Sequence, residues 1–426
     1  MINILIILMG KFLSKFSSAF NLGHGSTWPG HIALNINKNF IKQTIGPKTK
    51  VVLVAGTNGK TTTSALISHI LKQNGFSVVR NKSGANLLNG AASAIIQGIK
   101  PFSAKTDQNY LILEADENNL PLVISQTNAS YVIALDLFRD QLDRYGEIDA
   151  IIKKWKNSFE KLDKNTTLIL NADDPQISYL GKNLKTKILY FGLNENDQEI
   201  IEHGADSIFC PNCQHLLDYK SITFSHLGNW FCTNCSEKRP SLNISNFEAY
   251  PIPGTYNKYN TLAAILFATD QKLSDKLITN ALKSFKPAFG RQEEFEIDLR
   301  KVKIFLSKNP TSFNESISTI SDLKAKNILI VLNDRIPDGL DVSWIWDTNT
   351  SLLENIPNTT ISGDRAFDMA LRIGYGGLKN YQVLESLSDA IKQSLDKTKP
   401  GETLFILPTY SAMLETRKIL TGKKIL

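Results

Sequence analysis

Residues 51–63 read Val-Val-Leu-Val-Ala-Gly-Thr-Asn-Gly-Lys-Thr-Thr-Thr, and this stretch decides the fold around it. Its apolar, mostly β-branched start predicts a buried strand. Gly56 and Gly59 bound a tight loop, and Lys60 opens a predicted helix that ends at Asn74, before a glycine. This arrangement is typical of an anion site, because backbone N–H groups and the helix dipole converge at the loop. An ordinary strand-to-helix turn is the alternative.

The loop suits the phosphates of a nucleotide. Lys60 supplies a point charge for the β- and γ-phosphates, and the hydroxyl of Thr61 can ligand Mg²⁺. The strict pattern Gly-x-x-x-x-Gly-Lys puts its first glycine at position 54, where this chain has Val54. The residues predicted to bind phosphate and metal are Gly56, Thr57, Asn58, Gly59, Lys60, Thr61 and Thr62.

Composition indicates a globular protein with an uneven charge. The chain has 426 residues, enough for two or three domains, and 42% of them are hydrophobic. Residues 1–106 contain twelve Lys or Arg and no Asp or Glu, whereas the remainder has 36 basic and 41 acidic residues. An anionic substrate or membrane surface fits the basic part. Nucleic-acid binding is not predicted, because no aromatic-basic motif accompanies the charge.

The first twenty residues predict an amphipathic helix. The apolar run from Ile4 to Met9 is too short to cross a bilayer, and no basic region precedes it as in a signal peptide. We expect the helix either to lie on an anionic leaflet or to pack on its own domain. Its predicted apolar face comprises Leu5, Leu8, Phe12, Phe16 and Ala19.

The only four cysteines follow the pattern Cys-x₂-Cys, eighteen residues, Cys-x₂-Cys. This spacing is typical of a zinc ribbon, in which four thiolates complete a tetrahedral, structural site. Paired disulfides are the alternative, but they do not suit a chain of cytosolic character. If all four thiols hold zinc, none remains for a cysteine-dependent glutaminase reaction. The four are Cys210, Cys213, Cys232 and Cys235.

A second buried strand is predicted at Tyr110–Ala115, with acidic residues at its carboxyl end. Glu114 is followed closely by Asp116 and Glu117. In open α/β sheets this end faces the ligand crevice, so Glu114 is the candidate ligand for Mg²⁺. Solvated acids at a strand end are the alternative.

Two asparagines precede a predicted apolar helix at residues 261–268. Asn257 and Asn260 are three residues apart and share a face near the first helical turn. An amide can both donate to and accept from adenine, although helix capping is an alternative role. Arg291, in the string Gly-Arg-Gln-Glu, is a candidate for a nucleotide phosphate or ribose.

These segments occur along the chain in the order found in Mur ligases. The phosphate loop comes first, Asn-Ala-Asp-Asp-Pro (171–175) follows, and Gly-x-Tyr-Asn-x-x-Asn comes after it. Only about fifty residues precede the loop, and a ribbon is inserted; both features resemble the MurT family, the synthetase subunits of lipid II isoglutaminyl synthases. Further strings that resemble this family lie at residues 23–30, 137–147, 308–314, 338–347 and 407–410.

The resemblance implies an α/β ligase in three parts. A short basic segment covers residues 1–45, and a central ATP-binding domain covers 46–300 with the ribbon inserted at 205–240. A smaller C-terminal α/β domain covers 301–426, and we expect a hinge at Arg291–Arg300.

The resemblance also assigns roles to residues. An aspartate of the C-terminal domain is expected to complete the Cys-His pair of a partner glutaminase; Asp341 matches best, with Asp338 and Asp347 as alternatives. Asp136 stands where this family has an asparagine, which leaves the contact at that strand end open. The residues assigned to ATP and Mg²⁺ are Lys60, Thr61, Glu114, Asn257, Asn260, Arg291 and, at the ribose, Asn309.

The C-terminal half alternates apolar runs with helical stretches, which predicts a mostly parallel sheet. Trp344 and Trp346, among three acids, are typical of either core or a docking surface. Strands are predicted at Lys303–Leu306, Ile328–Leu332, Thr359–Ser362 and Thr403–Leu407, and helices at Phe367–Ile373, Leu387–Leu395 and Ser411–Ile419.

By resemblance, the activity is ATP-dependent amidation of the α-carboxylate of D-glutamate in lipid II, through an acyl phosphate. The ammonia is expected from a GatD-type glutamine amidotransferase on another chain. Lipid II lies at the inner face of the cytoplasmic membrane, so a cytoplasmic, peripheral location is expected. The alternatives are a Mur- or folylpolyglutamate-type ligase that joins an amino acid, and a zinc-ribbon nucleic-acid protein with a vestigial ATP fold.

Overall fold

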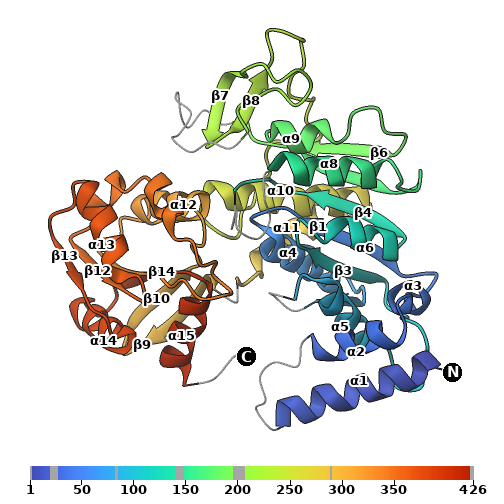
Figure 1. Cartoon of the computed structure of the whole chain (residues 1–426), viewed down its shortest axis with the longest axis horizontal. Helices are drawn as coiled ribbons and strands as arrows, with labels where there is room; N and C mark the ends of the chain where they lie inside the picture. The colour runs from blue at the N-terminus through green and yellow to red at the C-terminus, as the bar shows by residue number, and fades with distance from the viewer. Residues whose placement is uncertain are drawn as a thin grey trace.

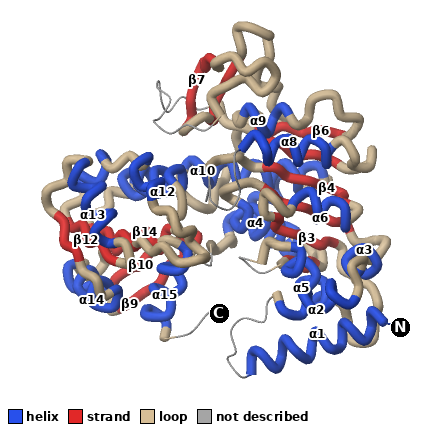
Figure 2. Tube along the Cα trace, viewed as in Figure 1, coloured by secondary structure: helices blue, strands red, loops and turns tan. Residues whose placement is uncertain are grey.

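The computed structural model describes residues 2–19, 27–81, 85–139, 148–194, 207–287 and 290–422. Two six-stranded sheets, each flanked by helices, make up most of the molecule, and a two-stranded hairpin projects from the first (Figure 1; Figure 2). The expected α/β fold with a second, C-terminal sheet is confirmed.

The first sheet is entirely parallel and has the order β2-β3-β1-β4-β5-β6. Because β1 lies between β3 and β4, the loops that follow these three strands meet at one edge. The strands are β1 (Lys50–Ala55), β2 (Val78–Arg80), β3 (Tyr110–Ala115), β4 (Ala129–Ala134), β5 (Thr167–Asn171) and β6 (Lys187–Phe191).

Helices cover both faces of this sheet. One face packs against α4 (Lys60–Gln73), α10 (Thr255–Asp270) and α11 (Asp275–Lys283). Helix α10 begins before the expected start at residue 261, because the turn that contains Asn257 is already helical. The other face packs against α1 (Ile2–Ala19), α2 (Trp28–Ile36), α3 (Phe40–Thr44), α5 (Leu88–Gly98), α6 (Leu120–Gln126), α8 (Ile148–Phe159) and α9 (Pro175–Tyr179).

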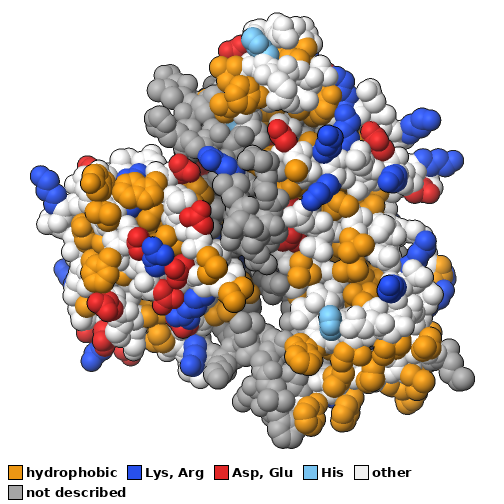
Figure 3. Space-filling view, in the orientation of Figure 1, with side chains coloured by type: hydrophobic (Ala, Val, Ile, Leu, Met, Phe, Trp, Pro, Cys, Tyr) orange, Lys and Arg blue, Asp and Glu red, His pale blue; other side chains and the backbone are white. Residues whose placement is uncertain are grey.

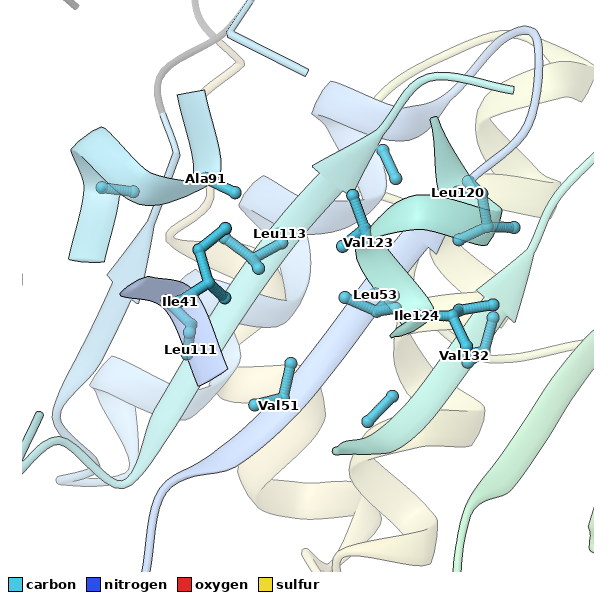
Figure 4. Packing of buried hydrophobic residues seen from close by; sticks show 14 of the residues in the cluster. Ile41, Val51, Leu53, Ala91, Leu111, Leu113, Leu120, Val123, Ile124 and Val132 are labelled. Atoms are coloured by element: carbon cyan, nitrogen blue, oxygen red, sulfur yellow. The ribbon is translucent and has the colours of Figure 1, made fainter. Parts of the chain in front are cut away.

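The packing of strand β1 explains why its sequence is apolar from Val51 to Ala55. Successive side chains of a strand point to opposite faces. Val51 and Leu53 therefore pack in the core under α3, α5 and α6 (Figure 4), whereas Val52 and Val54 pack in the core under α4 and α10. Both faces are covered by helices, so the buried positions from Val51 to Ala55 must be apolar, whereas Lys50 at the exposed start of the strand need not be.

Helix α1 packs on its own domain through one side. Ile6 and Ile7 are buried in the core beneath the first sheet, and Lys11 donates a hydrogen bond to the Gln97 carbonyl of α5 (3.1 Å). The predicted apolar face, from Leu5 to Phe16, points largely outward instead; the side chain of Ala19 lies outside the described residues. In the part of the chain that the structure describes, no helix has the length and hydropathy needed to cross a membrane.

The second sheet has the order β13-β12-β11-β14-β10-β9, and all its pairs are parallel except β9 with β10. Its strands are β9 (Arg291–Ile297), β10 (Arg300–Phe305), β11 (Asn327–Val331), β12 (Asn358–Ser362), β13 (Tyr381–Val383) and β14 (Thr403–Pro408). Its helices are α12 (Pro310–Asp322), α13 (Ala366–Tyr375), α14 (Leu387–Lys397) and α15 (Tyr410–Thr421), with 3-10 turns η1 (Ser343–Asp347) and η2 (Ser351–Asn355).

This half differs from expectation at β9, at α12 and at the short strand β13, which was not predicted. The segment Arg291–Arg300, expected to be a hinge, forms β9 and the turn into β10. The sequence did not indicate this strand, because Phe295 and Ile297 are its only hydrophobic side chains that pack on the core. Strands at a sheet edge commonly have few hydrophobic and many charged side chains. Helix α12 was also not predicted, although Asn309 caps it through a capping box and Pro310 is its first residue.

The inserted ribbon contains β7 (Asp218–Phe224) and β8 (Leu227–Phe231), paired antiparallel. Trp230 of β8 is buried, and its indole N–H donates to the Ala172 carbonyl beyond β5 (3.0 Å). Arg239 forms an ion pair with the buried Asp173 (3.2 Å). These two contacts fix the ribbon to the carboxyl edge of the first sheet.

Candidate nucleotide site

The loop after β1 has the backbone that its glycines predict. Gly56 and Gly59 both have positive φ, and Gly59 is the N-cap of α4. A Cβ at Gly59 would also lie 2.0 Å from the Asn260 side-chain oxygen, so only glycine lets α10 approach the loop. Thr57 is tied to Phe138 by hydrogen bonds in both directions (3.0 and 3.1 Å). The loop is therefore held in shape before any ligand arrives.

Lys60 is folded over this loop. Its ammonium group donates to the carbonyl of Gly56 and to that of Thr57 (3.2 Å), and it lies 3.5 Å from a carboxylate oxygen of Glu117. A bound phosphate would offer the same ammonium group a stronger acceptor than a neutral carbonyl. The position fits the predicted phosphate role.

Thr61 and Glu114 come together at the start of α4. The Thr61 hydroxyl donates to one oxygen of Glu114 (2.7 Å), and the Ser64 hydroxyl donates to the other (2.7 Å). Arg80 lies 3.6 Å from the same carboxylate. A hydroxyl and a carboxylate side by side are hard oxygen donors of the kind that Mg²⁺ takes, so these residues fit the metal.

Asn81 orients Glu114 from the neighbouring strand. Its side-chain oxygen accepts from the Glu114 N–H (2.9 Å), and its amide donates to the Glu114 carbonyl (3.1 Å). The sequence did not single out Asn81, Ser64 or Arg80. Only the pairing of β2 with β3 places Arg80 opposite Ile112 and thus beside Glu114.

Asp136 occupies the other side of the loop. One of its carboxylate oxygens accepts the backbone N–H of Asn58 (2.8 Å), one of the amides that a phosphate would use. Burial raises the pKa of Asp136 to about 7; Asp174 and Glu117 add to the rise, while the Asn58 N–H and Lys60 oppose it. Asp136 thus places a carboxylate at an anion site, whereas the expected asparagine would place no charge there.

The predicted base-binding residues lie on α10, facing the loop. Asn260 donates to the side-chain oxygen of Asn257 (3.3 Å) and accepts from the Thr63 hydroxyl (3.3 Å). The Asn257 amide donates to the Pro253 carbonyl (2.7 Å). Both asparagines are buried, so they connect the loop, α4 and α10 as well as lining the cleft.

Arg291 and Asn309 approach from the second sheet. Arg291 lines the cleft, and its neighbour Gln292 donates to the Tyr256 hydroxyl of α10 (2.9 Å). The Asn309 amide lies 3.4 Å from the side-chain oxygen of Asn58 in the phosphate loop. Asn309 therefore touches the loop directly and caps α12 at the same time.

A cleft lies between the two sheets and is lined by residues of both. Asn58, Gly59 and Thr62 line it from the loop, and Thr311 and Glu315 line it from α12. No role at the cleft was predicted for Tyr256, Phe138 or Glu315, because the residues that line this space are far apart along the chain.

The four cysteines form one cluster. Their sulfur atoms all lie within 4.8 Å of one another, and the thiols are free rather than paired as disulfides. Each Cys-x₂-Cys turn is followed by a residue of positive φ, Gln214 in the first and Ser236 in the second, so the two knuckles are alike. A Zn–S bond of about 2.3 Å in a tetrahedron needs sulfurs about 3.8 Å apart. The cluster fits zinc.

The three aspartates considered for a partner site have different environments. Asp338 is buried and accepts from the backbone N–H of Ser411 (2.7 Å), and burial raises its pKa. Asp341 is exposed and accepts the Ser343 N–H (2.8 Å), which lowers its pKa. Asp347 is exposed and lies 3.9 Å from Arg139. Asp341 and Asp347 are thus accessible, whereas Asp338 is not.

Comparison with known proteins agrees with this geometry. Residues 54–268 match the model of the Mur ligase middle domain, and residues 306–413 match the MurT ligase C-terminal model. The MurT subunit of lipid II isoglutaminyl synthase from Streptococcus pneumoniae is 32% identical, over 95% of this chain and 94% of the relative. The chain belongs to the MurT family. The MurT subunit from Staphylococcus aureus strain COL is 33% identical over 86% of each chain.

Solved structures show the same fold at lower identity. A pseudomurein peptide ligase type C from Methanothermus fervidus has a TM-score of 0.67 at 21% identity, covering 90% of this MurT-family chain and 80% of its own. MurF ligase from Thermotoga maritima, in complex with ADP, has a TM-score of 0.62 at 14% identity, covering 91% of this chain and 82% of its own.

Of the family strings quoted above, residues 23–26 and 140–147 lie outside the described residues.

Proposed function

We propose that this chain is the synthetase subunit that amidates the α-carboxylate of D-glutamate in lipid II, giving D-isoglutamine for peptidoglycan synthesis at the expense of ATP. Two relatives at 32–33% identity bear the name of that subunit. The observation that carries the proposal is the cluster of Lys60, Thr61 and Glu114 at a glycine-bounded loop beside the cleft.

The chemistry follows from this arrangement. A carboxylate oxygen attacks the γ-phosphorus of ATP, the bond to ADP breaks, and an acyl phosphate forms. Ammonia then attacks the acyl carbon, phosphate leaves, and the nitrogen loses a proton to give the amide. Lys60 would leave the loop carbonyls for the phosphates and offset the charge that develops there. Mg²⁺, held by Thr61 and Glu114, would neutralise charge on the phosphate oxygens.

The remaining nucleotide residues have proposed roles of their own. Asn257 and Asn260 would bind the base, with Arg291 at a phosphate or the ribose. Asn309 would close on the ribose from the second sheet, which its contact with the loop supports. We place the boundary between the central and C-terminal parts between α11 and β9, shortly before residue 300, because β9 pairs with β10.

The nitrogen would come from a separate chain. All four cysteines lie in the ribbon, so a cysteine-dependent glutaminase reaction needs another protein. Two relatives are named as subunits, which supports a heteromeric enzyme. We propose a GatD-type glutamine amidotransferase as the partner, with Asp341 completing its Cys-His pair. A lipid-linked substrate and the acid-free residues 1–106 support a place at the inner face of the cytoplasmic membrane.

We further propose that Cys210, Cys213, Cys232 and Cys235 hold a structural zinc ion. The purified chain should contain about one zinc per molecule, because four thiolates close the coordination shell. Replacing Cys213 and Cys235 with Ser should remove the metal and lower the unfolding temperature, measured by metal analysis and calorimetry. Full stability without metal would contradict the proposal.

The central test replaces Lys60. In the complex with the amidotransferase, Lys60→Ala should lower ATP-dependent amidation of lipid II about 10³-fold with glutamine and with ammonium alike, because a charge at the transferring phosphoryl group is lost. Lys72→Ala, on the exposed end of the same helix, is the matched control and should keep full activity. Normal amidation by the Lys60 variant would refute the phosphate site.

The same assay separates the rival functions. A ligase that joins an amino acid would give no amide with ammonium and would turn over ATP only with that amino acid. A nucleic-acid-binding protein with an inactive ATP site would turn over no ATP and would bind with a steep dependence on salt. Amide formation from ammonium, lipid II and ATP supports the amidation proposal against both.

A further inference from the structure

The outward side of α1 carries an apolar stripe that the nucleotide site does not use. We define the stripe as Ile2, Leu5, Met9, Phe12 and Phe16, which follow one another at intervals of three and four residues and therefore share one helix face. All five are exposed, Leu5 by 63% and Phe12 by 67%. Figure 3 shows hydrophobic side chains in a row along this helix. Contiguous exposed apolar surface of this kind marks an interaction site.

The stripe is not needed to hold the helix in place. Ile6 and Ile7 on the opposite side are buried, and Gly10 sits so close to the domain that a Cβ there would lie 3.0 Å from Ile96. The Gln97 side chain also donates to the Ser14 hydroxyl (2.7 Å). The inner face thus fixes α1 in one orientation, and the outer face is presented rigidly to the surroundings.

We infer that the stripe is a docking surface for an anionic lipid bilayer, with α1 lying in the plane of the interface. A helix of this kind buries an apolar face at the boundary of headgroups and acyl chains while its lysines meet anionic headgroups. Lys15 is exposed beside the stripe. Trp28 at the start of α2 is 72% exposed, and Pro29 next to it packs near Gly10, so an aromatic residue of the type found at membrane interfaces lies close by.

Charge favours a lipid surface over a second copy of this chain. Spacing of three and four residues would also suit a helix pair. However, residues 1–106 contain twelve basic and no acidic residues, so two copies would bring like charges together. An anionic bilayer complements the same charge. Only the purpose of this membrane contact rests on the proposed function: it would hold the cleft near a lipid-linked substrate.

The test is flotation of the full chain with vesicles, without nucleotide or substrate. The chain should float with vesicles of phosphatidylcholine containing about one third phosphatidylglycerol, and less with phosphatidylcholine alone. Phe12→Ser with Phe16→Ser should weaken partitioning at least about tenfold, because two large apolar side chains leave the interface. Lys15→Gln should weaken it about threefold and only at low salt.

The matched control is Phe367→Ser on α13, a phenylalanine that is 64% exposed on the C-terminal domain. It should float like the unaltered chain, and so should Lys60→Ala, which separates this inference from the proposed activity. Leu5→Ser is a milder second variant should the double variant misfold. Absence of flotation, or equal loss in Phe367→Ser, would overturn the inference. The inference would also be overturned if the unaltered chain bound no vesicles but formed a dimer in solution that dissociates in the double variant Phe12→Ser with Phe16→Ser.

Discussion

The carboxyl edges of the two sheets differ in how far some of their charged side chains are exposed to solvent. At the first sheet, Glu114 is buried and its carboxylate accepts from Thr61 and Ser64. At the second sheet, Arg335 after β11 pairs with Asp364 after β12 (2.8 Å), and both are about 40% exposed. Buried groups that bond to one another make a site that is ready for a small ligand. Exposed charges around a loop suit a surface that another protein completes.

The same contrast appears in single aspartates. Asp136, at the first sheet, is buried beside other acids, and burial raises its pKa to about 7. Asp341, at the second sheet, is exposed, and the Ser343 N–H lowers its pKa. The first is an internal group whose charge costs stability, whereas the second is a fully charged group available to a partner. Substitutions in both places test this difference.

The largest effect is expected at Asp341. Asp341→Asn should lower glutamine-driven amidation by up to about 10⁴-fold, the loss found when an orienting aspartate of a catalytic triad is replaced by asparagine. Activity with ammonium should be unchanged, because asparagine can still accept the Ser343 N–H and keep the loop in shape. The measurement is the ratio of the two activities in the purified complex.

Two neighbouring aspartates are the controls for this result. Asp347→Asn, also exposed, should leave both activities intact. Asp338→Asn should cost about 1–3 kcal/mol of stability, because one carboxylate oxygen accepts from the Ser411 N–H and the other from the Ser411 hydroxyl, and an amide has only one acceptor oxygen. Selective loss of glutamine-driven activity in either of these variants, instead of in Asp341→Asn, would move the glutaminase role to that residue.

Asp136 should give an intermediate effect that depends on pH. Its pKa is raised on folding from an ordinary value near 3.8 to about 7. The folded protein therefore binds a proton that the unfolded chain has lost between these values, and stability falls as pH rises through this window. Asp136→Asn removes the charge and should stabilise the chain by about 1–2 kcal/mol at pH 8 and by nothing at pH 4.

Urea unfolding at both pH values measures this difference. Asparagine also retains an oxygen that can accept the Asn58 N–H, so the loop contact is preserved. Asp218→Asn, an exposed acid at the start of β7, is the matched control and should show no such dependence. A gain for Asp136→Asn that is equal at both pH values would contradict a raised pKa.

Sequence reasoning worked where the decisive residues are near one another or carry a strong pattern. The glycine-bounded turn between β1 and α4 was predicted from thirteen consecutive residues, and the cysteine cluster from its spacing. The contact of Glu114 with Thr61 followed from a rule for the edges of parallel sheets. Strand β9 was missed because a charged edge strand has little hydrophobic pattern.

Contacts between distant segments could not be predicted in this way. The hydrogen bond from the Asn58 N–H to the Asp136 carboxylate joins residues that are 78 positions apart. The burial of Asp338 and the exposure of Asp341 depend on α15, which packs against only one of them. The resemblance favoured Asp341 and kept Asp338 and Asp347 as alternatives, and only the fold shows that Asp338 is buried.

The smallest effect is expected where the two sheets meet. Asn309 caps α12 of the second sheet and touches Asn58 in the phosphate loop of the first. Asn309→Ser should keep the cap, because serine is as good an N-cap residue, yet it is too short to reach the loop. Asn309→Ala should lose both. Stability should then fall by about 1 kcal/mol only in the alanine variant.

The KM for ATP should rise about threefold in both Asn309 variants, because each loses the contact across the cleft. Equal KM values for the unaltered chain and Asn309→Ser would show that Asn309 serves only the helix. In that case the second sheet would not help to hold the nucleotide through this residue. A rise in KM in both variants, with stability lost in only one, would mean that a single side chain supports its own domain and closes the site of the other.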